Sequence, residues 1–85
     1  MPKKSDGEVQ AEISALTELL PQLPQRARQA VDAAIEVLRD DLSNDAVHEK
    51  FEEGTEEFED ALTAFMWRNG VAGGSALSAW YRDLM

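Results

Sequence analysis

The chain of 85 residues contains no cysteine. Disulfides and thiolate metal sites are therefore excluded, and the absence is compatible with a reducing compartment. No run of apolar residues approaches the roughly 20 that a membrane-spanning helix needs. Residues 1–7 are not followed by the apolar segment of a secretory signal peptide. We therefore expect a cytoplasmic protein that makes no contact with a membrane.

Basic residues are also few. The chain has 8 lysines and arginines against 17 acidic residues, which gives a formal net charge of -9 at pH 7. Such a surface on average repels nucleic-acid phosphates and anionic lipids. We therefore expect no direct nucleic-acid binding, and the partner that fits this charge is a protein with a basic surface.

Groups of residues that would support catalysis are missing as well. His48 is the only histidine, and no serine stands in a spacing motif that would make it a nucleophile. Asp45 and His48 have the carboxylate-x-x-His spacing of di-iron bundles, but such sites collect carboxylates from several helices. A metal site would therefore require self-association and remains only an alternative. We predict no enzymatic activity, no cofactor and no metal.

Helical periodicity dominates the rest of the chain, and no alternating strand pattern is present. A first helix is expected over residues 8–20, with Ser5 or Asp6 as its cap, and a second over residues 24–42. Acidic and polar residues around 41–45 predict a break. The apolar positions of the two helices, spaced three or four apart, are Val9, Ile13, Leu16 and Leu20, then Ala27, Val31, Ala34, Ile35, Leu38 and Leu42.

A third helix over residues 44–69 has the clearest pattern, with steps of four and three that are typical of a helix packing along one stripe. Gly54 falls on this stripe, which indicates a close backbone contact or a local bend. Asn69-Gly70 marks its end. A short last helix is expected over residues 76–84. The stripe of the third helix consists of Val47, Phe51, Gly54, Phe58, Ala61, Leu62 and Phe65.

These elements predict an all-α fold, a small helical bundle of three longer helices plus a short C-terminal helix. Residues 1–7 are expected to form a disordered N-terminal tail, and residues 8–85 a single helical domain. In a chain this small the burial of one core only narrowly offsets the entropy of ordering, so helix packing or oligomerisation must supply the stability.

The acidic residues concentrate in the third predicted helix. On a helical wheel they lie opposite the apolar stripe, and Trp67 projects to the same acidic side. An aromatic side chain beside carboxylates resembles an interface anchor, although a following helix could equally cover it. The predicted partner-binding residues are Glu49, Glu52, Glu53, Glu56, Glu57, Glu59, Asp60 and Trp67.

Two functions follow from this pattern. The first is a non-enzymatic acidic protein that binds a basic protein surface, in its specific form a nucleic-acid mimic that inhibits nucleic-acid-handling machinery, as phage and mobile elements encode. The second is a homodimeric assembly or adaptor protein, in which the stripes of the second and third helices pair across two copies. In the second case the acidic face serves only solubility.

Overall fold

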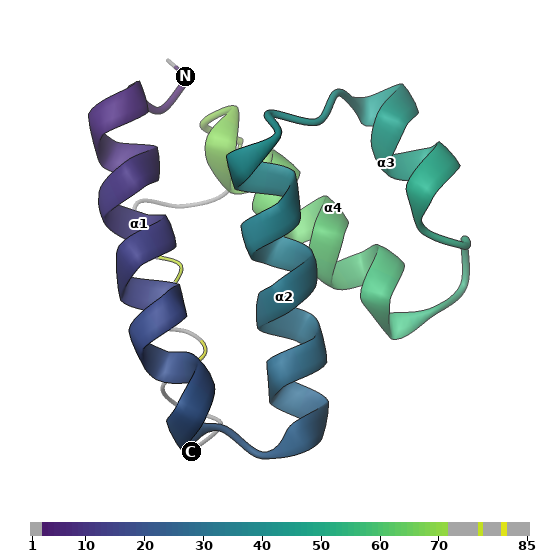
Figure 1. Cartoon of the computed structure of the whole chain (residues 1–85). Helices are drawn as coiled ribbons and strands as arrows, with labels where there is room; N and C mark the ends of the chain where they lie inside the picture. The colour runs from purple at the N-terminus through teal and green to yellow at the C-terminus, as the bar shows by residue number, and fades with distance from the viewer. Residues whose placement is uncertain (1–2, 72–76, 78–80, 82–85) are drawn as a thin grey trace.

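The computed structural model describes residues 3–71 together with Leu77 and Tyr81. Within this part of the chain all regular secondary structure is helical, which confirms the all-α class. None of the helices described there is long and apolar enough to cross a membrane. The elements in chain order are α1 (Asp6–Leu19), the short 3-10 helix η1 (Leu20–Gln22), α2 (Gln25–Arg39), α3 (Asn44–Lys50) and α4 (Glu56–Arg68) (Figure 1).

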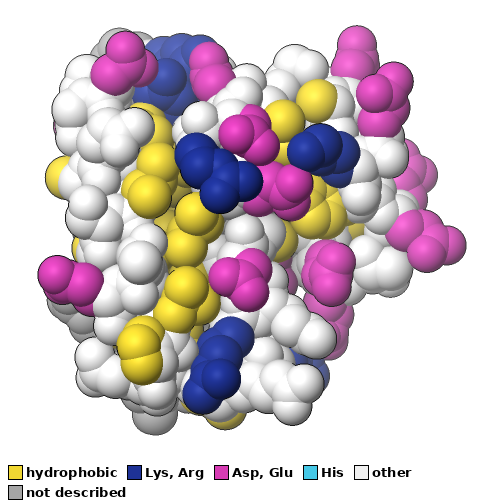
Figure 2. Space-filling view, viewed as in Figure 1, with side chains coloured by type: hydrophobic (Ala, Val, Ile, Leu, Met, Phe, Trp, Pro, Cys, Tyr) yellow, Lys and Arg dark blue, Asp and Glu magenta, His cyan; other side chains and the backbone are white. Residues whose placement is uncertain are grey.

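The first two helices form an antiparallel hairpin, with apolar side chains along the seam between them (Figures 1 and 2). The hydroxyl of Ser5 caps α1 by accepting a hydrogen bond from the backbone N–H of Glu8 at 3.2 Å, as predicted. Pro21 lies in η1 and Pro24 is the residue before α2. The two prolines therefore fix the turn of the hairpin, because neither can donate a backbone hydrogen bond.

The predicted break at residues 41–45 is confirmed, but α2 ends at Arg39 and not at Leu42. The backbone N–H of Leu42 donates to the carbonyl of Val37 at 3.1 Å, and Asp41 has a φ of +48°. This is the Schellman arrangement, in which the left-handed residue is usually glycine. Ser43 then caps α3 through the backbone N–H of Ala46.

The prediction of one continuous helix over residues 44–69 is wrong. The chain bends at residues 51–55 and divides that segment into α3 and α4. Gly54 has a φ of +86°, in the left-handed region that only glycine adopts readily, and a Cβ there would meet no atom within 4 Å. The glycine is needed for its backbone conformation and not for a close contact. Thr55 caps α4 through the backbone N–H of Phe58 at 3.2 Å.

The core forms around α2, which packs on α1 and most extensively on α4, while α3 packs on α4. Small residues supply much of the buried face of α2, since Ala27, Ala30, Ala33 and Ala34 are all buried. Leu77 and Tyr81 are helical and join the same core, each with 3% of its surface exposed. The other residues of the helix predicted over 76–84 lie outside the described residues.

The end of α4 is a second Schellman turn and confirms the predicted stop at Asn69-Gly70. Gly70 has a φ of +75°, and the backbone N–H of Val71 donates to the carbonyl of Met66 at 2.9 Å. The backbone N–H of Lys4 donates to the carbonyl of Arg68 at 2.8 Å. This contact and the start of α1 at Asp6 join the first described residues to the rest of the fold.

Candidate acidic interaction site

The predicted acidic residues gather around the bend between α3 and α4, although on three elements and not on one helix. Glu49 lies on α3, Glu52 and Glu53 lie in the bend, and the others lie in the first turns of α4. Figure 2 shows acidic side chains over α3 and the bend that follows it. Asp60 is half-buried, and the exposed members are Glu49, Glu52, Glu53, Glu56, Glu57 and Glu59.

Most of these carboxylates form no ion pair with the described residues. Arg26 pairs with Glu56, and His48 Nδ1 lies 2.7 Å from Glu53 Oε1. The remaining four exposed members form no ion pair in the part of the chain that the structure describes. We call these four the acidic edge: Glu49, Glu52, Glu57 and Glu59. The edge is a source of negative potential, and Lys50, which follows Glu49 in the chain, pairs instead with Glu36 at 2.9 Å.

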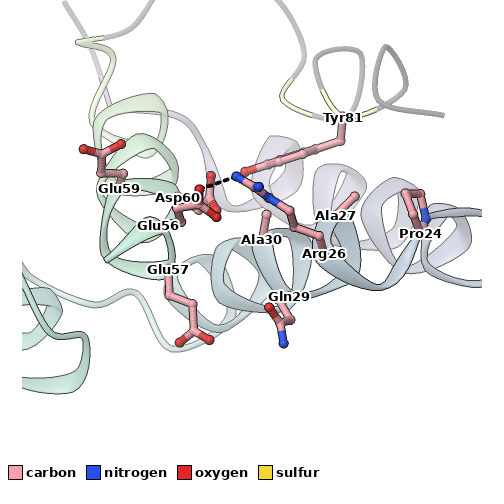
Figure 3. Close-up of a pocket in the computed structure, with 10 residues that line it drawn as sticks. All are labelled: Pro24, Arg26, Ala27, Gln29, Ala30, Glu56, Glu57, Glu59, Asp60 and Tyr81. Atoms are coloured by element: carbon pink, nitrogen blue, oxygen red, sulfur yellow. Dashed lines mark hydrogen bonds and ion pairs between the residues drawn. The ribbon is translucent and has the colours of Figure 1, made fainter. Parts of the chain in front are cut away.

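Beside the acidic edge lies a hollow of about 510 Å³ between α2 and the start of α4 (Figure 3). Ala27 and Ala30 of α2 line it, and the ring of Tyr81 reaches in from the opposite side. A second hollow of about 480 Å³ shares residues with the first. The residues common to both are Gln29, Glu56 and Glu57. We call the two together the acidic groove.

The acidic groove disfavours further negative charge. Burial, together with the carboxylates of Glu56 and Glu59, raises the pKa of Asp60 above its ordinary value, against the attraction of Arg26. Burial and the charge of Asp60 likewise raise the pKa of the Tyr81 hydroxyl. The Asp60 carboxyl therefore ionises against its neighbours, and a cation placed in the groove would relieve this repulsion.

Trp67 does not belong to this surface. Only 5% of its surface is exposed, and Lys4 Nζ lies 5.3 Å from the centre of its ring. The buried side of α4 advances in steps of three residues, through Phe58, Ala61 and Ala64 to Trp67. The predicted apolar stripe instead continued through Leu62 and Phe65. That course put Trp67 on the acidic, solvent-facing side of the helix. The role of Trp67 as an exposed anchor is therefore contradicted by its burial.

Among residues 3–71, Leu77 and Tyr81, no three histidine or acidic side chains converge as metal ligands would. The ring of His48 lies 5.0 Å from that of Phe58, centre to centre, and its Nδ1 faces Glu53. His48 therefore stabilises the bend from the side of α3.

Among the groove-lining residues that sequence reasoning missed, three polar ones come from outside the acidic segment. Arg26 and Gln29 lie on the second helix, and Tyr81 lies far along the chain, so only tertiary packing brings them to the acidic residues. The exposed glutamates themselves could be recognised from their density in one segment. No protein family, no curated protein and no solved structure matches this chain.

Proposed function

We propose that the protein is a non-enzymatic interaction protein whose acidic edge and acidic groove bind a basic surface of a protein partner. The observation that carries this proposal is that Glu52, Glu57 and Glu59, which are exposed and form no ion pair with the described residues, line the hollows beside the start of α4. Complementary charge accelerates the encounter of two proteins and fixes their relative orientation. A net charge of -9 extends the same attraction beyond the site.

The composition of the acidic groove favours lysine and arginine side chains as its occupants. Ala27 and Ala30 give it apolar walls, while Glu57 and Asp60 contribute carboxylates. Lysine and arginine combine an apolar stem with a cationic head, so they match both kinds of surface at once. The proposed contact is therefore a basic segment that lies across the start of α4.

The nucleic-acid-mimic form of this proposal rests on fewer features than the pattern of acidic residues indicated. Because the bend divides the acidic residues, they do not form a single row along one helix. Charge complementarity remains, and a partner that normally binds nucleic acid would present the required basic surface. Competition between this protein and duplex DNA for the captured partner tests this form.

The experiment is a pull-down from source-organism lysate with a tagged protein, followed by mass spectrometry of the captured partner. The test variant is Glu52→Lys/Glu57→Lys, since both residues border the second hollow. The matched control is Glu18→Lys/Asp32→Lys, which reverses two exposed acids on α1 and α2. Both variants change the net charge equally, so a difference between them reports on position.

The proposal expects a partner with a basic surface that elutes as salt rises, since screening weakens exposed charge contacts. The test variant loses the partner and the control variant keeps it. Equal capture by all three proteins would remove the acidic edge from the interaction. Melting curves of the variants establish that each is folded.

A further inference from the structure

The apolar stripe of the sequence runs through the bend between α3 and α4 without changing register. Val47 and Phe51 precede the bend, Phe58 and Ala61 follow it, and all four side chains are buried. Gly54 occupies the stripe position between them. Two separate helices do not require a common register, whereas a single helix does. The sequence of residues 44–68 is therefore compatible with a second, straight conformation.

Phe51 is buried in the core, but few polar contacts among the described residues hold the rest of the bend in place. The backbone N–H and the hydroxyl of Thr55 donate to the carbonyl of Glu52 at 3.3 and 2.6 Å, and Glu53 pairs with His48. Glu52, Glu53 and Gly54 are exposed, and Gly54 has a positive φ while Phe51 and Thr55 have extended backbones. A continuous helix requires all three residues to rotate to the α region, and Gly54 is the one whose conformation in the bend a side chain disfavours.

We propose that residues 51–55 are a hinge through which two copies of this chain exchange α4. In the exchanged dimer α3 and α4 of each copy join into one helix, and α4 packs on α2 of the other copy. The contacts of α4 with the first half of the chain are kept, but each now links two copies. This is domain swapping, and the occupant of the vacated surface of α2 is a second copy of the same chain.

A second copy is required because a single chain cannot straighten at low cost. The contacts between α2 and α4 are the most extensive of the fold, and α3 also packs on α4. Straightening would move Phe58 and Trp67 away from the core that contains Val31 and Val47. Only an identical chain offers surfaces of the same shape to receive them. Exchange restores that burial and adds the helical hydrogen bonds of residues 51–55.

Charge opposes the straight helix. Glu49 and Glu53, Glu52 and Glu56, and Glu53 and Glu57 would each stand four residues apart on one face, where like charges repel. Added salt screens this repulsion, so the dimer should gain from salt. Added salt should instead weaken the binding of a basic partner by the acidic edge. The two proposals can therefore fail independently of each other.

The test compares Gly54→Ala with Gly54→Asn. Neither Cβ would meet a neighbouring atom, so each variant reports on the backbone alone. Alanine disfavours a positive φ and favours a helix, whereas asparagine tolerates the left-handed region and is a poor helix former. Light scattering measures the dimer, and circular dichroism at about 222 nm measures helix content.

For Gly54→Ala we expect the dimer association constant to rise at least about tenfold over the wild type, because each dimer contains two hinges. Its helix signal should rise with the dimer, and both should increase with salt. The Gly54→Asn protein should remain like the wild type. Dimers carrying two different tags should not mix until the protein is unfolded, since exchange requires α4 to leave its core.

A Gly54→Ala protein that is monomeric, with an unchanged helix signal and a lower melting temperature, would overturn the proposal. Rapid mixing of tagged dimers would also overturn it, because surface association exchanges without unfolding. If Gly54→Ala does not fold, the test is made with wild-type protein. The protein is unfolded and then refolded at high and at low concentration, and light scattering measures the dimer in each sample. Dimer from the concentrated sample alone supports exchange, and monomer from both contradicts it.

Discussion

The guanidinium of Arg68 lies 3.1 Å from the carboxylate of Asp6, although 62 residues separate them in the sequence. The same buried side chain donates to the carbonyl oxygen of Lys4 and, at 3.4 Å, to the carboxylate of Asp41. One arginine at the end of α4 therefore joins the start of α1 and the turn after α2. The planar fork of arginine allows this, because it presents five N–H groups in fixed directions.

Replacing Arg68 with alanine should lower the free energy of unfolding by about 1–3 kcal/mol, through lost hydrogen bonds and lost packing of the side chain. Asp6 is 96% exposed, so its carboxylate returns to water and adds no large penalty. Urea denaturation followed by circular dichroism measures the change. Arg39→Ala is the control, because Arg39 is exposed and pairs only with its neighbour Asp40 within the described residues. A loss below about 0.5 kcal/mol for Arg68→Ala would contradict its proposed role.

Asp60→Asn should stabilise the protein at neutral pH. The pKa of Asp60 is raised in the folded state by burial and by Glu56 and Glu59, so its ionised form is less favourable there than in the unfolded chain. The penalty is complete above the folded pKa and disappears as pH falls below the ordinary value of 3.8. The gain in unfolding free energy should therefore be present at pH 7 and absent at about pH 3. A loss of stability at pH 7 would mean that the attraction of Arg26 prevails.

Asp41→Asn should instead lower the free energy of unfolding at neutral pH. Burial acts to raise the pKa of Asp41, but hydrogen bonds and charges of Lys3 and Arg68 together hold it below its ordinary value of 3.8. Its ionised form therefore stabilises the fold above that value, and this stabilisation is lost as pH falls through the lower folded pKa. Asparagine keeps the left-handed backbone but removes the charge. The variant should be less stable than the wild type at pH 7, and the difference should shrink in acid denaturation experiments. A difference that is constant with pH would contradict this.

Thr55→Ala should cost about 1 kcal/mol, because the hydroxyl that caps α4 is lost. Thr63→Ala is a matched control on the same helix. The hydroxyl of Thr63 donates to the carbonyl of Glu59 at 2.9 Å, which is already occupied by the helix, so its removal should be close to neutral. Thermal unfolding of both variants gives the comparison. Equal effects would show that the cap contributes nothing specific.

The sequence predicted the first two helices well because their signals are local. Ser5 and the prolines at 21 and 24 mark boundaries through hydrogen bonds that they can or cannot make. The predicted helix end at Asn69-Gly70 was correct for the same reason, since glycine readily adopts the left-handed conformation of the residue after a helix. The concentration of exposed carboxylates was also visible, although its arrangement in space was not.

The bend at Gly54 was missed because apolar periodicity does not report the sign of φ. The stripe from Val47 to Phe65 keeps its register whether the glycine lies in a helix or in a turn. Trp67 was misplaced because the buried side of α4 advances from Phe58 in steps of three residues, whereas the predicted stripe continued through Leu62 and Phe65. The contacts of Arg68 could not be predicted, because they join residues from three distant segments.

The late position of α4 in the chain has a consequence for synthesis on the ribosome. The hairpin of α1 and α2 involves neighbouring segments and can form as soon as both have left the exit tunnel. The surface of α2 that α4 covers stays open until residue 68 follows. During this interval the chain exposes to a neighbouring copy the apolar surface that its own α4 later covers.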